Sequence, residues 1–252
     1  LLRASQKAGF DTIRLAAMAL QSEGLMMAAA KASREDSGAY LARVHPVLQE
    51  QAALADSLGL VSERGRALYS DGLAYEKQGE VDQAIERFQQ ALDISLTSGN
   101  LELVNEIRAT AAAAYESQGR TSGAIAMLDD IAGDLGGSEA LDLEAEAALE
   151  LAQNLYEKGR LLNTGYRFAE AAVELERALA IRKSIAVPRP WGQMGLELGW
   201  SQYSLGLLEE ASQTIAEALP RTVREGNQEL LFRAFGSLAA MARTHGTYEQ
   251  TT

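Results

Sequence analysis

The chain has 252 residues, of which 47% are hydrophobic and 23% charged, and its formal net charge is −12 at pH 7. It contains no cysteine and two histidines, which excludes disulfides, thiolate catalysis and cysteine-ligated metal sites. The negative charge argues against binding to nucleic acid or anionic membranes, because phosphate recognition requires clustered lysine and arginine. Alanine and leucine are the commonest residues and prolines are few, which predicts an all-α chain.

The first predicted helix pair occupies residues 1–60. Residues 3–31 form its first helix, residues 33–38 the connection and residues 39–58 its second helix. Pro46 either starts this second helix or kinks it, because proline lacks a backbone N–H and fixes φ. The pair diverges from the segments that follow it.

Four similar segments follow, at residues 65–100, 105–138, 142–187 and 191–226. Apolar residues in each are spaced three and four apart, which is the periodicity of a helix. Each segment therefore predicts a helix, a turn and a second helix. Small residues recur where the two helices approach closely, at Gly72, Ala112, Ala152, Gly199, Ala84, Ala124 and Ala211. The space between neighbouring helices is filled by Phe88, Leu128 and Ile215, and first helices end at Gly79, Gly119 and Gly206.

The segment at 142–187 carries a two-turn insertion. The simplest account extends its first helix to about Leu162, moves the turn to residues 163–165 and places Gly159 inside the helix, at about 1 kcal/mol relative to alanine. The extended tip would carry Tyr156, Leu161, Leu162, Tyr166 and Phe168. Either this tip is a contact site, or the next repeat covers it.

Residues 228–252 predict the first helix of an incomplete repeat. Its apolar residues surround most of the helix, at Leu230, Leu231, Phe232, Phe235, Leu238 and Met241. A terminal repeat normally has a polar outer face. We therefore expect that further repeats follow in a longer protein, or that residues 228–246 contact a partner or a second copy.

The repeated pattern resembles the tetratricopeptide repeat (TPR) superfamily, which it matches best at Gly72, Tyr75, Gly79, Ala84, Phe88 and Ala91. The period is about 40 residues instead of about 34, as in arrays attached to signal-responsive ATPases, CHAT-type proteases and kinesin light chains. The resemblance implies a right-handed superhelical solenoid of antiparallel helix pairs, a single array of about 11 helices over residues 1–252.

In this superfamily the first helices line a concave face on which peptide ligands lie. By resemblance, the partner-binding residues are Arg66, Tyr69, Leu73, Glu76, Lys77, Glu106, Glu116, Glu146, Glu150, Gln153, Glu157, Glu197, Trp200, Tyr203 and Arg233. The paired lysine and asparagine residues of the family's carboxylate clamp are absent, which argues against chaperone C-termini as ligands. The face is acidic with aromatic anchors, and this favours a basic or amphipathic partner segment. Trp200 has an alternative role in packing between helices.

Catalytic signatures are missing: there is no phosphate-binding glycine loop, no His-Glu-x-x-His and no Gly-x-Ser-x-Gly. His45 and His245 lie far apart in sequence, and we expect each to be structural or solvated. We therefore predict a non-enzymatic, cytoplasmic interaction scaffold or sensor arm that binds a protein or peptide, needs no cofactor or metal, and is a fragment of a larger protein. We expect no nucleic-acid or membrane partner. The alternatives are self-association through residues 228–246, or a regulatory domain of a larger enzyme whose catalytic part lies outside these residues.

Overall fold

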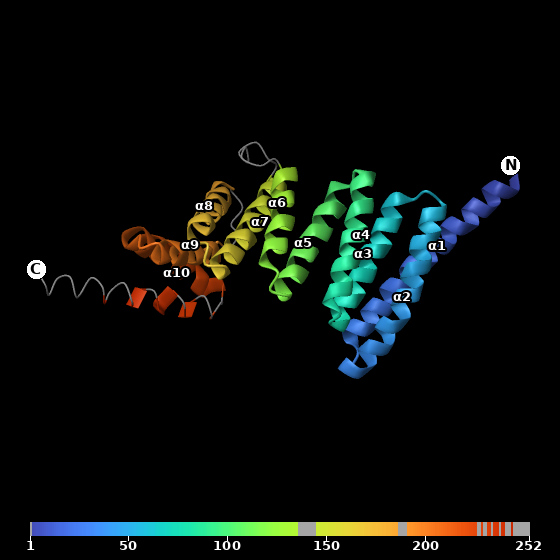
Figure 1. The fold of residues 1–252 in the computed structure, drawn as a ribbon, viewed down its shortest axis with the longest axis horizontal. Helices are drawn as coiled ribbons and strands as arrows, with labels where there is room; N and C mark the ends of the chain where they lie inside the picture. Colours follow the sequence, from blue (N-terminus) through green and yellow to red (C-terminus); the bar gives the residue numbers. More distant parts are fainter. Residues whose placement is uncertain are drawn as a thin grey trace, which may run out of the picture. The chain divides into compact units, whose positions relative to one another are not determined.

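The computed structural model describes residues 2–135, 145–185 and 191–225, together with Gln228, Leu231, Phe232, Ala234, Phe235, Gly236, Leu238, Ala239 and Arg243. Every regular element in these residues is a helix, which confirms the predicted all-α fold (Figure 1). The helices with defined bounds are α1 (Leu2–Lys31), α2 (Arg34–Ser57), α3 (Val61–Gln78), α4 (Val81–Ser98), α5 (Leu101–Ser117), α6 (Thr121–Asp134), α7 (Ala145–Thr164), α8 (Phe168–Ser184), α9 (Gly192–Ser204) and α10 (Leu208–Glu225).

By its internal contacts the chain divides into two compact units, Leu1–Met127 and Leu128–Thr252. In the first unit, each of the helices α1 to α4 packs on the helix that follows it. In the second unit, α7 packs on α8, α8 on α9 and α9 on α10. Short turns join the helices of a pair, which therefore run antiparallel. The continuity and superhelical handedness of one array over residues 1–252 stay predictions.

Glycines in the left-handed conformation close three of the turns inside the pairs, those between α3 and α4, α5 and α6, and α9 and α10. The three predicted helix stops have positive φ angles of 80°, 67° and 79°, at Gly79, Gly119 and Gly206. At the end of α3, the Gly79 N–H donates to the Glu76 carbonyl at 2.9 Å, and the Glu80 N–H donates to the Tyr75 carbonyl at 3.0 Å. These bonds satisfy carbonyls that the helix end leaves unpaired.

The two helices of a pair approach closely at the predicted small residues. A β-carbon on Gly72 of α3 would lie 2.5 Å from Cε1 of Phe88 on α4. Gly199 of α9 has the same relationship to Ile215 of α10, at 2.4 Å from its Cγ1 atom. Phe88 and Ile215 are buried. The predicted packing of a large side chain against a small one is thus confirmed in both units.

The first helix pair differs from its prediction in where the second helix starts. We expected residues 33–38 to form a connection, but α2 begins at Arg34. The cause is an N-cap: the Ser33 side chain accepts a hydrogen bond from the Asp36 N–H at 3.2 Å. Pro46 lies inside α2 and does not start it.

The two-turn insertion lengthens α7 as predicted and keeps Gly159 inside the helix, but the helix ends at Thr164 instead of about Leu162. The expected protruding tip is wrong, because Tyr156, Leu161 and Leu162 are buried. The added turns reach α9, against which α7 packs. Of the expected tip residues only Tyr166 is largely exposed, at 82%.

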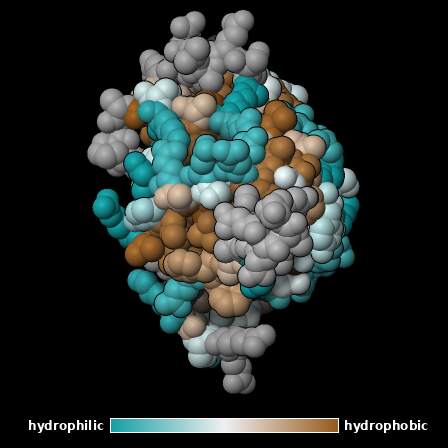
Figure 2. Space-filling view, turned by 90° about the vertical axis from the view of Figure 1, so that its left-hand side faces the viewer, coloured by the Kyte–Doolittle hydropathy of each residue, from teal (hydrophilic) through white to brown (hydrophobic). Residues whose placement is uncertain are grey.

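The described residues after Glu225 are helical. Ala234 belongs to the buried cluster of α9 and α10, and Leu238 packs against that cluster. Apolar side chains are nevertheless exposed in this unit, and they include Leu207, Val223, Phe232 and Phe235. Figure 2 shows hydrophobic residues on the surface of the molecule seen from this side. No helix in the described part of the chain is long and apolar enough to cross a membrane.

Candidate partner-binding surfaces

The first candidate surface lies on α3 and α5 in the first unit. Its predicted residues are Arg66, Tyr69, Leu73, Glu76 and Lys77 on α3, and Glu106 and Glu116 on α5. Arg66, Lys77 and Glu106 are exposed, whereas Leu73, Glu76 and Glu116 are half-buried. We call these residues the α3/α5 surface.

Tyr69 connects the two helices of the α3/α5 surface. Its hydroxyl is 2.9 Å from Oγ1 of Thr110 on α5, and its ring lies 5.8 Å from that of Phe88. Burial raises the pKa of Tyr69, and the nearby carboxylates of Glu106 and Glu76 raise it further. The structure therefore brings three of the predicted residues together. Because Tyr69 is only 9% exposed, it supports the surface instead of offering a large ring to a ligand.

The second candidate surface lies on α7 and α9 in the second unit. Glu146, Glu150 and Gln153 are exposed along α7. The Gln153 side-chain amide donates to Glu157 at 2.9 Å, and Glu157 also pairs with Arg160 at 2.9 Å. We call Glu146, Glu150, Gln153 and Glu157, together with Trp200 and Tyr203 of α9, the α7/α9 surface.

Trp200 and Tyr203 form the aromatic part of the α7/α9 surface. Their ring centroids are 5.9 Å apart with an interplanar angle of 36°. Both side chains are half-buried, and Tyr203 also packs against the core of α9 and α10. Tyr203 thus has one part in the core and one part open to solvent, and Trp200 is partly open to solvent beside it, which is typical of aromatic anchors at interfaces.

Glu197 does not lie on the α7/α9 surface, and its predicted role in ligand binding is corrected. It is 2% exposed. The Asn163 side-chain amide donates to the Glu197 carboxylate at 3.0 Å and to its backbone carbonyl at 3.1 Å. Ser201 donates to the Asn163 side-chain oxygen at 2.8 Å. The carboxylate is therefore used to hold the end of α7 on α9.

The last predicted site residue, Arg233, lies outside the described residues, as does His245. On the α3/α5 surface three carboxylates accompany two cations, whereas the α7/α9 surface has three carboxylates. The acidic character is stronger in the second unit.

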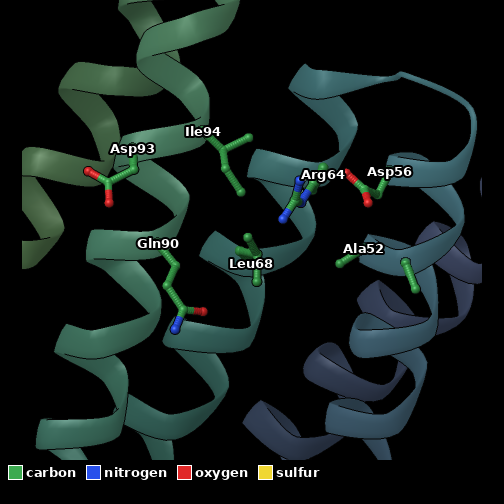
Figure 3. Close-up of a pocket in the computed structure, with 8 residues that line it drawn as sticks. Ala52, Asp56, Arg64, Leu68, Gln90, Asp93 and Ile94 are labelled. Atoms are coloured by element: carbon green, nitrogen blue, oxygen red, sulfur yellow. Dashed lines mark hydrogen bonds and ion pairs between the residues drawn. The ribbon is translucent and has the colours of Figure 1, made fainter.

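A pocket that we did not predict lies between α2, α3 and α4 (Figure 3). Its volume is about 350 Å³, and it is lined by Ala52, Ala53, Asp56, Arg64, Leu68, Gln90, Asp93 and Ile94. Arg64 and Asp56 lie side by side at its α2 edge and form an ion pair at 2.5 Å. The pocket is at the small end for ligand sites. No periodic pattern in the sequence indicated it, because its lining comes from three helices.

Comparison with solved structures identifies the fold. A kinesin light chain with TPR-like repeats, described as from Podosopora anserina, superposes with a TM-score of 0.61 at 16% identity, covering 85% of this chain and 99% of that one. BtubC (BKLC) from P. vanneervenii gives 0.54 at 18% identity, covering 86% and 92%. A tetratricopeptide repeat protein from Parabacteroides merdae gives 0.55 at 16% identity, covering 89% and 77%.

The chain has a TPR-like fold. No family model matches its sequence, and no curated protein matches it. The TPR resemblance of the repeated columns is thus confirmed at the level of the fold. The similarity to these structures establishes the fold alone and indicates no ligand.

Inside the TPR-like first unit, a buried polar cluster joins three helices. His45 Nδ1 of α2 lies 2.6 Å from Oδ1 of Asp71 on α3, and Arg87 Nε of α4 lies 2.9 Å from Oδ2 of Asp71. The His45 ring stacks on Tyr75 with centroids 4.1 Å apart. This cluster binds helices together, which agrees with the structural role expected of His45. The described residues hold no group of three or more His, Cys, Asp or Glu residues suited to a metal ion.

Proposed function

We propose that the chain is a protein-interaction scaffold that binds a basic or amphipathic segment of a partner on its first-helix surfaces. The supporting observation is the α7/α9 surface, where exposed carboxylates accompany the half-buried Trp200 and Tyr203. Carboxylates attract a basic segment and increase its association rate, while aromatic side chains supply most of the binding energy. The TPR-like fold is compatible with this use.

The proposal places the chain in the cytoplasm as one part of a larger protein, without enzymatic activity of its own. Each surface is proposed by itself. On the α3/α5 surface, Glu76, Glu106 and Glu116 would attract a basic segment around the buried Tyr69. On the α7/α9 surface, Trp200 and Tyr203 would anchor an amphipathic segment. Glu197 has no part in ligand binding, because it is used inside the protein.

Peptide selection tests this proposal directly. A phage-displayed peptide library is panned on the 252-residue chain, and the selected sequences are synthesised and measured by fluorescence anisotropy. We expect selection of peptides that combine Lys or Arg with aromatic or aliphatic residues. Their affinity should fall as salt rises, because the exposed charges are screened.

Substitutions on the α7/α9 surface test whether the selected peptides bind there. Trp200→Ala combined with Glu150→Lys should weaken the selected peptides by more than about tenfold and leave the helical circular dichroism intact. Glu210→Lys is the matched control, because it makes the same charge change at an exposed position on α10. Unchanged affinity in the double variant, or equal loss in the control, would contradict the proposed surface.

Self-association through residues 228–246 is a second candidate. It is favoured by Phe232 and Phe235, which are 82% and 54% exposed. Most of the other residues in this segment lie outside the described part of the chain. Replacing Phe232 and Phe235 by Gln and measuring the mass in solution tests it separately from peptide binding.

A further inference from the structure

The outer face of α1 carries a row of apolar side chains that the described residues do not cover. Phe10, Ile13, Leu20 and Met27 are 68%, 70%, 71% and 59% exposed. Ala17 and Gly24 lie between them on the same face and are also exposed. We call these six residues, at positions 10, 13, 17, 20, 24 and 27, the α1 seam.

The α1 seam has the spacing of a coiled coil. Its residues are alternately three and four apart, so they occupy the a and d positions of a heptad. Leu15, Ser22 and Ala29 repeat every seven residues on the opposite side of the helix, where they are buried. Ala29 belongs to the core cluster shared with α2. α1 therefore has one face that packs inside its own unit and an opposite, exposed apolar face whose spacing suits packing against another helix.

The α1 seam is complementary to itself when two copies run antiparallel. In that arrangement a positions face d positions, so Ile13 of one copy faces Gly24 of the other. Leu20 likewise faces Ala17, and Phe10 faces Met27. Each large residue in the centre meets a small one, as packing of a knob into a hole requires. A parallel arrangement would instead place Gly24 opposite Gly24 and Ala17 opposite Ala17, which leaves voids.

The residues beside the α1 seam permit the antiparallel arrangement. Between residues 10 and 27, the exposed charged residues flanking it are Arg14 and Glu23. In the antiparallel arrangement Arg14 comes beside Gln21 of the other copy, and Glu23 beside Ala16, so like charges do not meet. Arg14 is paired with Glu50 of α2 in its own chain. The charge pattern therefore presents no repulsion to a second copy.

We propose that two copies of this chain associate through their α1 seams as an antiparallel helix pair. The contact is isologous: the same patch is used on both copies around a twofold axis between residues 17 and 20. The α1 seam is about 26 Å long, which indicates a small interface and a weak, concentration-dependent association. It uses neither the α3/α5 nor the α7/α9 surface and stands independently of the proposed function.

Sedimentation equilibrium of the 252-residue chain over a wide concentration range tests the association. The expected result is a monomer–dimer equilibrium for the wild type and a monomer for Ile13→Gln combined with Leu20→Gln. The matched control is Leu96→Gln combined with Val173→Gln, because both residues are exposed and apolar but lie outside α1 and outside residues 228–246. This control should leave the dimer unchanged. Circular dichroism should show the same helicity in all variants.

A second variant separates association from folding. A β-carbon on Gly24 would meet no atom within 4 Å in the monomer, and leucine has a higher helix propensity than glycine. Gly24→Leu should therefore keep or raise the Tm of the dilute monomer. It should nevertheless raise the Kd of the dimer by at least about tenfold, because leucine fills the space that Ile13 of the other copy needs.

The orientation is measured with a spin label on Ala30→Cys, since the chain has no other cysteine. Residue 30 lies level with residue 7 of the other copy in the antiparallel pair, so the two labels are separated by about 35 Å along the axis. A parallel pair would bring them within about 15 Å. The proposal is overturned by a wild type that stays monomeric, by a dimer that survives the seam variants, or by the short label distance.

Discussion

Gly159 of α7 lies against Leu175 of α8 so closely that a β-carbon on residue 159 would be 2.5 Å from Cγ of Leu175. Leu175 is completely buried. The contact explains why a glycine stands inside a helix, where it costs about 1 kcal/mol relative to alanine. Glycine occupies this position despite its low helix propensity, because the two helices approach too closely there for a side chain.

Gly159→Ala should therefore destabilise the protein, although alanine is the better helix former. Overpacking of a filled core costs about 1–3 kcal/mol, which exceeds the gain in propensity of about 1 kcal/mol. Gly38→Ala is the control, because a β-carbon there meets nothing within 4 Å. The control should gain about 0.5–1 kcal/mol. Urea unfolding of both variants checks the opposite signs, and two stabilising changes would contradict the close approach.

Tyr166→Gly should stabilise the protein. Tyr166 is the one residue other than glycine with a positive φ, 59°, in the part of the chain that the structure describes. This conformation costs a residue with a β-carbon about 1–2 kcal/mol, while the exposed ring makes an edge contact with Phe168 at 6.0 Å. We expect a gain of about 0.5–1 kcal/mol by thermal or urea unfolding. Tyr166→Ala removes the ring but keeps the β-carbon, so it should not share this gain.

Lys158→Met should destabilise the second unit. The ammonium group of Lys158 lies 2.6 Å from Asp129 and 2.7 Å from Glu174, whose side chain is 17% exposed. Loss of the lysine leaves the partly buried Glu174 carboxylate without this cation, which should lower the free energy of unfolding by about 1–3 kcal/mol. Arg167→Met is the control, because its ion pair with Glu170 is about half exposed and should matter little. Equal losses in both variants would contradict the importance of burial.

Lys158 also makes the stability of the second unit depend on pH. Burial lowers the pKa of Lys158, but the hydrogen bonds that its ammonium group donates to Asp129 and Glu174 outweigh this effect, so the pKa is raised from its ordinary value of 10.5. The stabilisation is therefore complete below the unfolded-state value and is lost as pH rises beyond it. The stability difference between wild type and Lys158→Met should shrink above about pH 10.5.

Tyr69→Phe tests the electrostatics of the α3/α5 surface. Loss of the hydrogen bond with Thr110 should cost about 1 kcal/mol at neutral pH. The pKa of Tyr69 is raised by burial and by Glu106 and Glu76, so the neutral hydroxyl favours the folded state. This contribution is present below the unfolded-state value of 10.0 and is lost as pH rises further. Unfolding at increasing pH should show the wild type losing its advantage over Tyr69→Phe above about pH 10; a constant difference would contradict the assigned surroundings.

Much of the fold could be predicted because its signals are local. A glycine at Gly79 predicts a left-handed helix stop, and small residues such as Gly72 predict a close helix pair. The two-turn insertion preserved the helical phase, so the extension of α7 followed from counting residues. These features depend on residues within one helix pair, and a repeated pattern shows them several times.

The remaining features depend on contacts between helices that the spacing did not specify. The residue after Gly165 takes the left-handed conformation at the α7–α8 turn, because Tyr166 occupies the place that glycine has in the other turns. Glu197 was assigned to a ligand surface from its position in the repeat, but the added turns of α7 bring Asn163 against it. The sequence also contained no indication that Asp71 is the centre of a buried polar cluster, because its partners are on α2 and α4.

The bond between Asn163 and Glu197 joins two first helices, α7 and α9, that belong to different pairs. Tyr69 and Thr110 join α3 and α5 in the same way. In an array whose helices contact only their neighbours in sequence, an end pair can open alone. Here the opening of α9 must also break its bonds to α7, so each unit should lose its structure in a more cooperative step, with slow hydrogen exchange shared by both first helices.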